Sequence, residues 1–216
     1  TLEYRDMSWD ESVKEHKWTR GAIKNKIAMK PVVRPRKLVS AGMLMKRPPA
    51  TNAPLPFDVF IGDWCAPYGK GVLPDFMITC HETTNKVGAC VPGMSIRTEN
   101  CVDGLLPRHI DQWSKFKYDL SADENAKYQR EVSKGRFLDA DGNSERAADL
   151  EDGRYLIFRI RTQTNEVGRV VRANYGTIGE SLDFQGDLTL NIHVNPVAND
   201  TSIEHDWAYK NMKKGR

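Results

Sequence analysis

Residues 155–178 read YLIFRIRTQTNEVGRVVRANYGTI, and this stretch decides the expected fold. Its two halves are rich in the β-branched and aromatic residues that favour strands, and residues 165–168 between them end in a glycine suited to a tight turn. The pattern predicts a β-hairpin. A third strand is predicted over residues 187–194, where apolar and polar residues alternate so that one face is buried and the other solvated.

Weaker strand patterns extend towards the N-terminus. They cover residues 76–80, a segment within 86–97 and residues 37–45. Residues 122–134 stay open between a helix, which a capping-box pattern would begin, and an alternating strand. Short strands separated by turn signals, with no internal repeat apparent at 20–50 residues, predict a mainly β antiparallel sandwich over residues 57–216.

Residues 1–56 are expected to form a basic arm. Residues 1–50 hold twelve Lys and Arg against five Asp and Glu, whereas the remaining chain holds twenty against twenty-four. A capping-box pattern predicts a helix over residues 8–29, and six prolines between residues 31 and 56 predict an extended connector. The cations of the arm are expected to bind a neighbouring subunit or acidic glycans, or else to form a solvated arm packed on the acidic body; they include Lys24, Lys26, Lys30, Arg34, Arg36 and Lys37.

Four cysteines, Cys65, Cys80, Cys90 and Cys101, lie within 37 residues. Their gaps of fourteen, nine and ten residues are too wide for the paired spacing of a zinc site. Two disulfides are therefore predicted, with all three connectivities open, and they would place the protein in an exported compartment. Reduced, buried thiols in a cytosolic protein are the alternative.

The segment around Cys65, Trp-Cys-Ala-Pro-Tyr, is similar to a thioredoxin motif whose second cysteine is replaced by Tyr68. A redox cysteine needs a helix N-terminus to lower the pKa of its thiol. Gly69, Gly71 and Pro74 oppose such a helix. Residues 57–64 are instead predicted to be a short strand that runs into a glycine- and proline-containing loop.

No pattern specifies catalysis, a metal or a cofactor. Residues 139–145, DADGNSE, depart from a calcium-binding EF-hand loop in the position of the glycine and are predicted to form a tight turn. The five histidines are scattered, and the chain contains no G-x-S-x-G, P-loop or G-x-G-x-x-G pattern. Nucleic-acid recognition is not favoured, because Trp18 is the single aromatic residue between Lys17 and Arg47.

Two stretches carry a family resemblance: residues 153–206, which contain YGTIG and NPVAND, and residues 56–71, PFDVFIGDWCAPYGKG. Together they resemble exported fimbrial-like proteins, associated with type IV pili, of Verrucomicrobia-type bacteria. The resemblance implies an immunoglobulin-like fold, a surface location and assembly into oligomers or a fibre. It implies no catalytic residue. The chain departs from pilins in lacking their apolar N-terminal helix.

The expected function is that of a non-enzymatic, exported structural or adhesive surface protein. No run of about 18 apolar residues occurs, so no membrane span is predicted; the chain begins with Thr1, which leaves open a removed signal or anchor. The first alternative is a domain that acts on or binds polysaccharide, with Trp64, Tyr68 and Trp113 beside a carboxylate pair. The second is a nucleic-acid-binding protein that uses the basic arm.

Overall fold

The chain divides into two compact units, Thr1–Val32 and Val33–Arg216. In the first unit, strands β1 (Asp6–Ser8) and β2 (Thr19–Gly21) pair antiparallel. The helix predicted over residues 8–29 is therefore wrong at β2, where a β-branched residue and a glycine both disfavour helix. The computed structural model describes residues 6–8, 19–21, 36–109, 121–139, 141–146, 149–150, 154–179 and 181–204.

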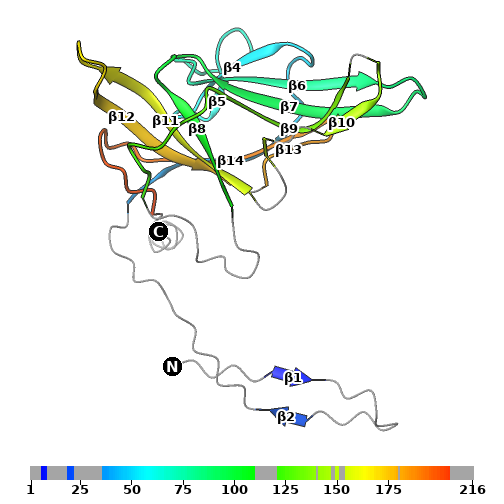
Figure 1. Cartoon of the computed structure of the whole chain (residues 1–216), viewed down its shortest axis with the longest axis horizontal. Coiled ribbons are helices and arrows are strands. Elements are labelled where there is room, and N and C mark those ends of the chain that lie inside the picture. Colours follow the sequence, from blue (N-terminus) through cyan, green and yellow to red (C-terminus); the bar gives the residue numbers. More distant parts are fainter. Residues whose placement is uncertain are drawn as a thin grey trace. The chain divides into compact units, whose positions relative to one another are not determined.

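The second unit is a sandwich of two antiparallel sheets (Figure 1). The first sheet has the strand order β10-β9-β7-β6-β4-β5. Its strands are β4 (Pro54–Asp58), β5 (Asp63–Trp64), β6 (Phe76–Thr84), β7 (Cys90–Thr98), β9 (Glu131–Leu138) and β10 (Ser144–Arg146).

The second sheet has the order β13-β14-β12-β11-β8. Strands β12 and β13 pair with different parts of one edge of β14, and β3 pairs with its other edge. Figure 1 shows β11, β12 and β14 crossing β6 and β7 at an angle. The strands are β3 (Val39–Lys46), β8 (Gly104–His109), β11 (Arg154–Thr164), β12 (Val170–Ile178), β13 (Asp183–Phe184) and β14 (Leu188–Val194).

The main core lies between the two sheets. Phe76 of β6 and Phe158 of β11 meet edge to face, with ring centroids 5.3 Å apart, and both are fully buried. Along β14 buried and half-buried residues alternate without exception, as the sequence predicts. The predicted antiparallel sandwich and the β11–β12 hairpin are both confirmed.

A smaller apolar cluster covers the outer face of the second sheet. Tyr155 and Ile157 of β11 pack there with Tyr175 of β12, against Ala122 and Ile203 from two irregular segments. Strand β11 is therefore buried on both faces, which explains its continuous apolar run at residues 155–158. The covering segments hold each other, because the Ala122 N–H donates to the Thr201 carbonyl at 2.8 Å.

Three hairpin turns share one hydrogen-bond pattern. They begin at Asn85, Asp139 and Asn165, whose backbone N–H donates to the carbonyl four residues later and whose side-chain Oδ1 accepts the N–H of that residue. The fourth residue of each turn is a glycine with positive φ. The first and third also share the sequence Thr-Asn-x-Val-Gly, a short similarity 80 residues apart. The predicted tight turn at residue 139 is confirmed.

The remaining predictions differ in outcome. The described part of residues 122–134 contains no helix, and β9 begins at Glu131, so the strand alternative is correct there. Strand β3, in the predicted arm, pairs with β14, so the sandwich includes residues that the sequence analysis assigned to the arm. None of the described segments forms a helix that could span a membrane.

Candidate functional site

The connection between β4 and β6, residues 58–75, is held in one shape by buried carboxylates. The Asp58 carboxylate accepts four backbone N–H groups at 3.0–3.1 Å: Oδ1 accepts from Phe60 and Ile61, and Oδ2 from Val72 and Leu73. One side chain therefore joins the two halves of the loop. Its neighbour Asp63 does the same on a smaller scale, accepting from Trp64 and Lys70.

Arg161 reaches this loop from the opposite sheet. Its guanidinium binds Asp75 through two contacts, Nε to Oδ1 at 2.8 Å and Nη2 to Oδ2 at 2.9 Å, and Nη2 also contacts Asp58 Oδ1 at 3.2 Å. The guanidinium carbon lies 4.2 Å from the Phe60 ring centroid, a cation–π distance. Arg161 thereby ties β11 to the loop.

Arg161 leaves the ladder of β11 at an irregularity. Its φ is +53°, which is strained for a residue other than glycine, and the β11–β12 register shifts between Ile160 and Gln163. Asp103 accepts the N–H groups of Arg161 at 3.0 Å and Thr162 at 2.8 Å. This carboxylate compensates for the strand partner that the bulge lacks. We call Asp58, Asp75, Asp103 and Arg161 the Asp–Arg cluster.

The three carboxylates of the Asp–Arg cluster differ in proton affinity. Burial acts to raise the pKa of Asp58, but the N–H donors of the loop and the Arg161 charge outweigh it, so its pKa lies below the usual value. Burial raises the pKa of Asp75 in spite of its contacts to Arg161, and burial also raises the pKa of Asp103. As pH falls, Asp75 and Asp103 are therefore protonated before Asp58.

Cys65 lies buried beside this cluster. Its pKa is raised by burial and by the negative charges of Asp58, Asp75 and Asp63. A raised thiol pKa opposes formation of the nucleophilic thiolate, so the local electrostatics oppose redox chemistry. The predicted strand over residues 57–64 is confirmed in part, because a turn at residues 59–62 separates β4 from β5. The predicted loop follows Cys65.

The structure contains no disulfide among Cys65, Cys80, Cys90 and Cys101, so the two predicted disulfides are absent. The sheet register gives the reason, because a disulfide needs α-carbons closer than about 7 Å. Cys90 begins β7 and Cys101 follows its end, roughly 30 Å away at the rise of a strand. Cys80 pairs with Met94, four residues and about 13 Å from Cys90. Cys65 lies beside the edge strand β5, across three strand spacings from β7.

Exposed apolar side chains concentrate beside the Asp–Arg cluster. Nine large apolar side chains in the described part of the chain are exposed, and seven of them lie in the loop or in the β11–β12 hairpin. Arg161 joins these two segments, so they share one end of the sandwich. We call this set the apolar end: Ile61, Tyr68, Val72, Leu73, Val167, Val170 and Val171.

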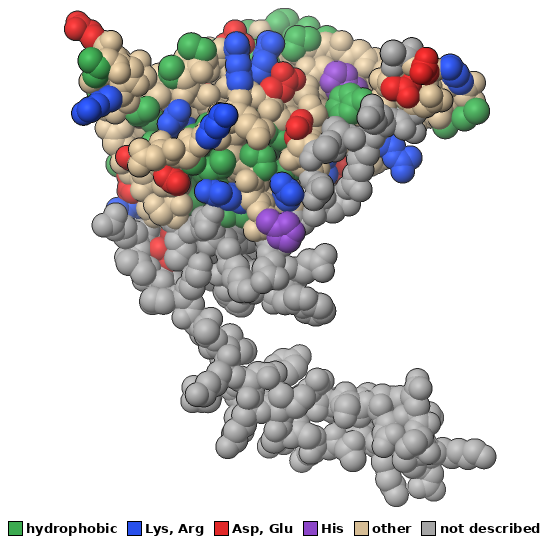
Figure 2. Space-filling view, in the orientation of Figure 1, with side chains coloured by type: hydrophobic (Ala, Val, Ile, Leu, Met, Phe, Trp, Pro, Cys, Tyr) green, Lys and Arg blue, Asp and Glu red, His purple; other side chains and the backbone are tan. Residues whose placement is uncertain are grey.

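The tip of the β11–β12 hairpin projects from the sandwich. All ten residues from 163 to 172 are exposed, and Figure 1 shows the tip extending beyond the neighbouring strands. Figure 2 shows hydrophobic, basic and acidic side chains together on this tip. Val87 at the β6–β7 tip is also exposed, but that tip lies at the opposite end of the sandwich (Figure 1).

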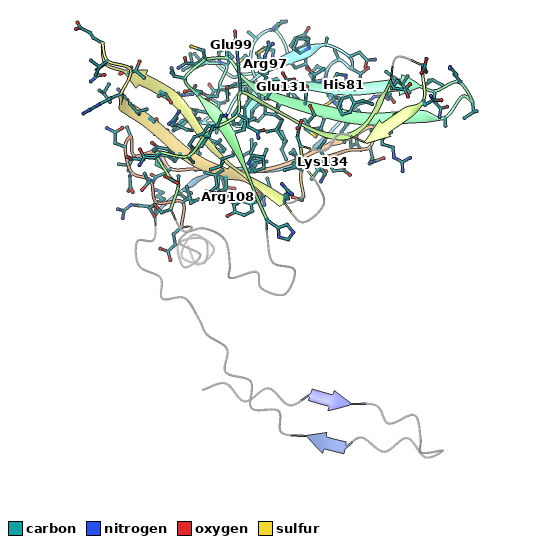
Figure 3. All side chains as sticks on the ribbon, viewed as in Figure 1. His81, Arg97, Glu99, Arg108, Glu131 and Lys134 are labelled. Carbon is teal, nitrogen blue, oxygen red and sulfur yellow. The ribbon has the colours of Figure 1, made fainter. Side chains whose placement is uncertain are left out.

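A second polar group lies on the outer face of the first sheet (Figure 3). Arg97 of β7 is paired in register with Glu131 of β9, and the His81 ring lies 5.0 Å from that of Phe137. Burial lowers the pKa of His81, while Glu131 opposes that shift. In the described part of the chain no three His, Cys, Asp or Glu residues are placed to hold a metal ion. This row of mixed charges is typical of a solvated sheet face.

The predicted binding arm is only partly described. Arg36 forms an ion pair with Asp200, and its N–H donates to the Glu204 carbonyl at 3.0 Å, so it fastens the chain to the sandwich. This gives Arg36 an anchoring role within the chain. Lys37 is exposed. The other predicted arm cations, Lys24, Lys26, Lys30 and Arg34, lie outside the described residues.

The aromatic set named for polysaccharide binding is not assembled among the described residues. Trp64 is only 9% exposed and packs edge to face on Phe57 with centroids 5.4 Å apart, so it belongs to the core. Tyr68 is exposed, but the nearby carboxylates Asp58 and Asp75 are buried and bonded to backbone and Arg161. Trp113 lies outside the described residues.

A scan of family models, a search of curated proteins and a search of solved structures found no match to this chain. The function is therefore inferred from the geometry of the apolar end. The sequence analysis missed this site, although Val72 and Leu73 stand between a glycine and a proline in a predicted loop. Large apolar residues in such a loop were the available signal.

Proposed function

We propose that this chain is a non-enzymatic structural or adhesive surface protein that attaches to a partner surface through its apolar end. The observation that carries the proposal is the concentration of seven of the nine exposed large apolar side chains at one end of the sandwich. Concentrated apolar exposure favours an interaction site, because scattered exposure is the norm on a soluble domain.

The rigidity of the loop supports the same proposal. The loop displays Ile61, Val72 and Leu73 while their own N–H groups are bonded to Asp58. A surface that is already ordered loses little conformational entropy on binding. Arg161, in β11 at the base of the hairpin, extends this order across the two sheets by bonding to Asp75 and Asp58.

An immunoglobulin-like topology is part of the proposal. The order β8-β11-β12 corresponds to the C-F-G sheet of that fold, with chain crossings between the sheets before and after β8. The first sheet departs from the pattern, because β7 pairs with β9 where the immunoglobulin order would place the following strand. Export and association with a pilus or fimbria rest on the sequence resemblance, since the free thiols remove the disulfide argument for export.

Attachment can be tested with isolated bacterial cell envelopes, which contain lipid, protein and polysaccharide together. We expect the wild-type chain to sediment with the envelopes, and the variant I61N/Y68N/V72N/L73N to remain in the supernatant. The matched control is V87N, because Val87 is 85% exposed but lies at the opposite end. Equal sedimentation of all three proteins, or none of the wild type, would contradict the proposal.

A further inference from the structure

We infer that the partner surface is an anionic lipid bilayer, into whose interface the apolar end inserts. This inference rests on the proposed function and names its partner. Three independent features carry it: the projecting shape of the apolar end, its charge, and the state of its backbone N–H groups.

The apolar side chains of the apolar end lie on an exposed loop and on a projecting hairpin tip. Val72 is 82% exposed and Val167 is 75% exposed, one on the loop and one on the hairpin. A protein interface requires a matching, closely packed counterpart for such projections. A bilayer is fluid and surrounds each projecting side chain with apolar chains. The shape therefore favours insertion over a flat protein contact.

The outward-facing charges of the two segments are more often positive than negative. Lys70 of the loop and Arg169 and Arg172 of the hairpin are exposed cations, against the exposed acid Glu166 and the half-exposed acid Asp63. The Asp58 and Asp75 carboxylates are buried and contact Arg161, so they present little negative charge outward. Cations close to the lipid surface strengthen binding to anionic headgroups. Tyr68 adds an aromatic ring with a polar tip, the type of side chain enriched at bilayer interfaces.

Five backbone N–H groups in the exposed part of the loop already have partners within the protein. The N–H groups of Val72 and Leu73 donate to Asp58, and that of Lys70 donates to Asp63. The Tyr68 N–H donates to the Cys65 carbonyl, and the Gly71 N–H donates to the Trp64 carbonyl. Inserted segments must satisfy their backbone groups internally, because lipid chains offer no hydrogen-bond partner.

The hairpin tip meets the same requirement through one side chain. Asn165 Oδ1 accepts the N–H groups of Val167 at 3.2 Å and Arg169 at 2.9 Å, and the Gly168 N–H donates to the Asn165 carbonyl. The most exposed valine of the tip therefore lies on a turn in which the N–H groups of Val167, Gly168 and Arg169 are already paired. Lowering this tip into the interface would break no hydrogen bond to protein.

Vesicle sedimentation tests the inference with the full chain. The probes are large unilamellar vesicles of phosphatidylcholine alone, and of phosphatidylcholine with phosphatidylglycerol at about 70:30, a composition chosen to supply anionic charge. We expect the wild type to bind the anionic vesicles, and to bind them less in high salt. V72D/L73D should weaken binding by about tenfold or more, because it places two charges where apolar groups insert.

Two controls accompany this test. The first measures the effect of an added charge away from the apolar end, and the second measures the electrostatic attraction of its cations to the lipid. V87D carries a new charge at the opposite tip and should bind as the wild type does. K70E/R169E/R172E keeps the apolar residues and should lose the preference for anionic over neutral vesicles. Circular dichroism melting of each variant establishes that it is folded before its binding is compared.

The outcomes distinguish this inference from the proposed function. If the chain sediments with cell envelopes but with neither vesicle, its partner is protein or polysaccharide; the inference is then overturned while the proposed function stands. Self-association of the wild type that V72D/L73D abolishes, without vesicle binding, would overturn it in the same way. Unchanged vesicle binding by V72D/L73D would show that the apolar end is not the inserting surface.

Discussion

Two irregular segments of the sandwich, residues 58–75 and 195–204, are fixed by similar contacts but serve opposite purposes. In the second segment, the fully buried Asn195 donates from Nδ2 to the carbonyls of Asp200 and Ser202. Asn199 binds strand β12, with Oδ1 accepting the Ala173 N–H. Both segments thus replace regular pairing with side-chain contacts to backbone groups.

The difference lies in where the apolar residues point. The C-terminal segment turns Ile203 inward onto the second sheet, where it covers the smaller apolar cluster. The loop turns Ile61, Val72 and Leu73 outward, although its backbone is equally well ordered. The C-terminal segment therefore exposes one large apolar side chain, Val197, whereas the loop exposes four, Ile61, Tyr68, Val72 and Leu73. Variants of the two segments should therefore separate stability from attachment.

The largest expected effect is that of Arg161→Ala. This change leaves the carboxylates of Asp58 and Asp75 buried without their cation, and removal of one partner from such a cluster costs about 3–5 kcal/mol. Urea denaturation followed by tryptophan fluorescence measures the loss, and attachment to vesicles should fall with it. The matched control is Arg159→Ala on the same strand, because Arg159 bonds to the carbonyls of Val102 and Glu124 instead of to buried carboxylates. Equal losses in the two variants would contradict the role given to the Asp–Arg cluster.

Asn195→Ala should have an intermediate effect on stability and none on attachment. It leaves buried carbonyl groups without their donor, at a cost of about 2 kcal/mol. The same urea titration measures this cost, and vesicle sedimentation should give the wild-type value. Lost vesicle binding in a variant that is still folded would refute the separation between the two segments.

The smallest effect is a change in the pH dependence of stability. For Asp75 and Asp103 the folded pKa lies above the unfolded value, so their contribution to stability falls as pH rises from about the unfolded value to the folded pKa. For Asp58 the folded pKa is lowered, so its contribution is lost as pH falls below the unfolded value.

Asp75→Asn should therefore reduce the fall in stability that occurs as pH rises from the unfolded pKa of Asp75 to its folded pKa. The loss of stability at lower pH, which comes from Asp58, should remain. Urea midpoints measured between about pH 3 and pH 7 provide the test, since carboxyl groups titrate in that range. An identical pH profile in wild type and variant would show that Asp75 does not titrate with a raised pKa. Asp139→Asn is the comparison of opposite sign: hydrogen bonds from Asn143 lower the pKa of Asp139, so its removal should change only the acid side of the profile.

Local sequence patterns anticipated the parts of the fold that depend on nearest neighbours. The alternation over residues 187–194 and the turn glycine of residues 165–168 predicted β14 and the β11–β12 hairpin, because period-two burial and positive φ are local requirements. The same reasoning identified the loop around Cys65. It misjudged the cysteines, because whether two thiols can meet depends on strand register, which no spacing along the chain reveals.

The candidate site shows the same limit. Asp58, Asp75, Asp103 and Arg161 are ordinary charged residues in the sequence, separated by up to 103 positions, and no motif joins them. By itself the sequence determined that this protein builds antiparallel strands, since side-chain alternation and turn chemistry are written residue by residue. Only the tertiary structure decided which apolar residues stay outside, because that depends on a guanidinium from one sheet meeting carboxylates of the other and so fixing the loop.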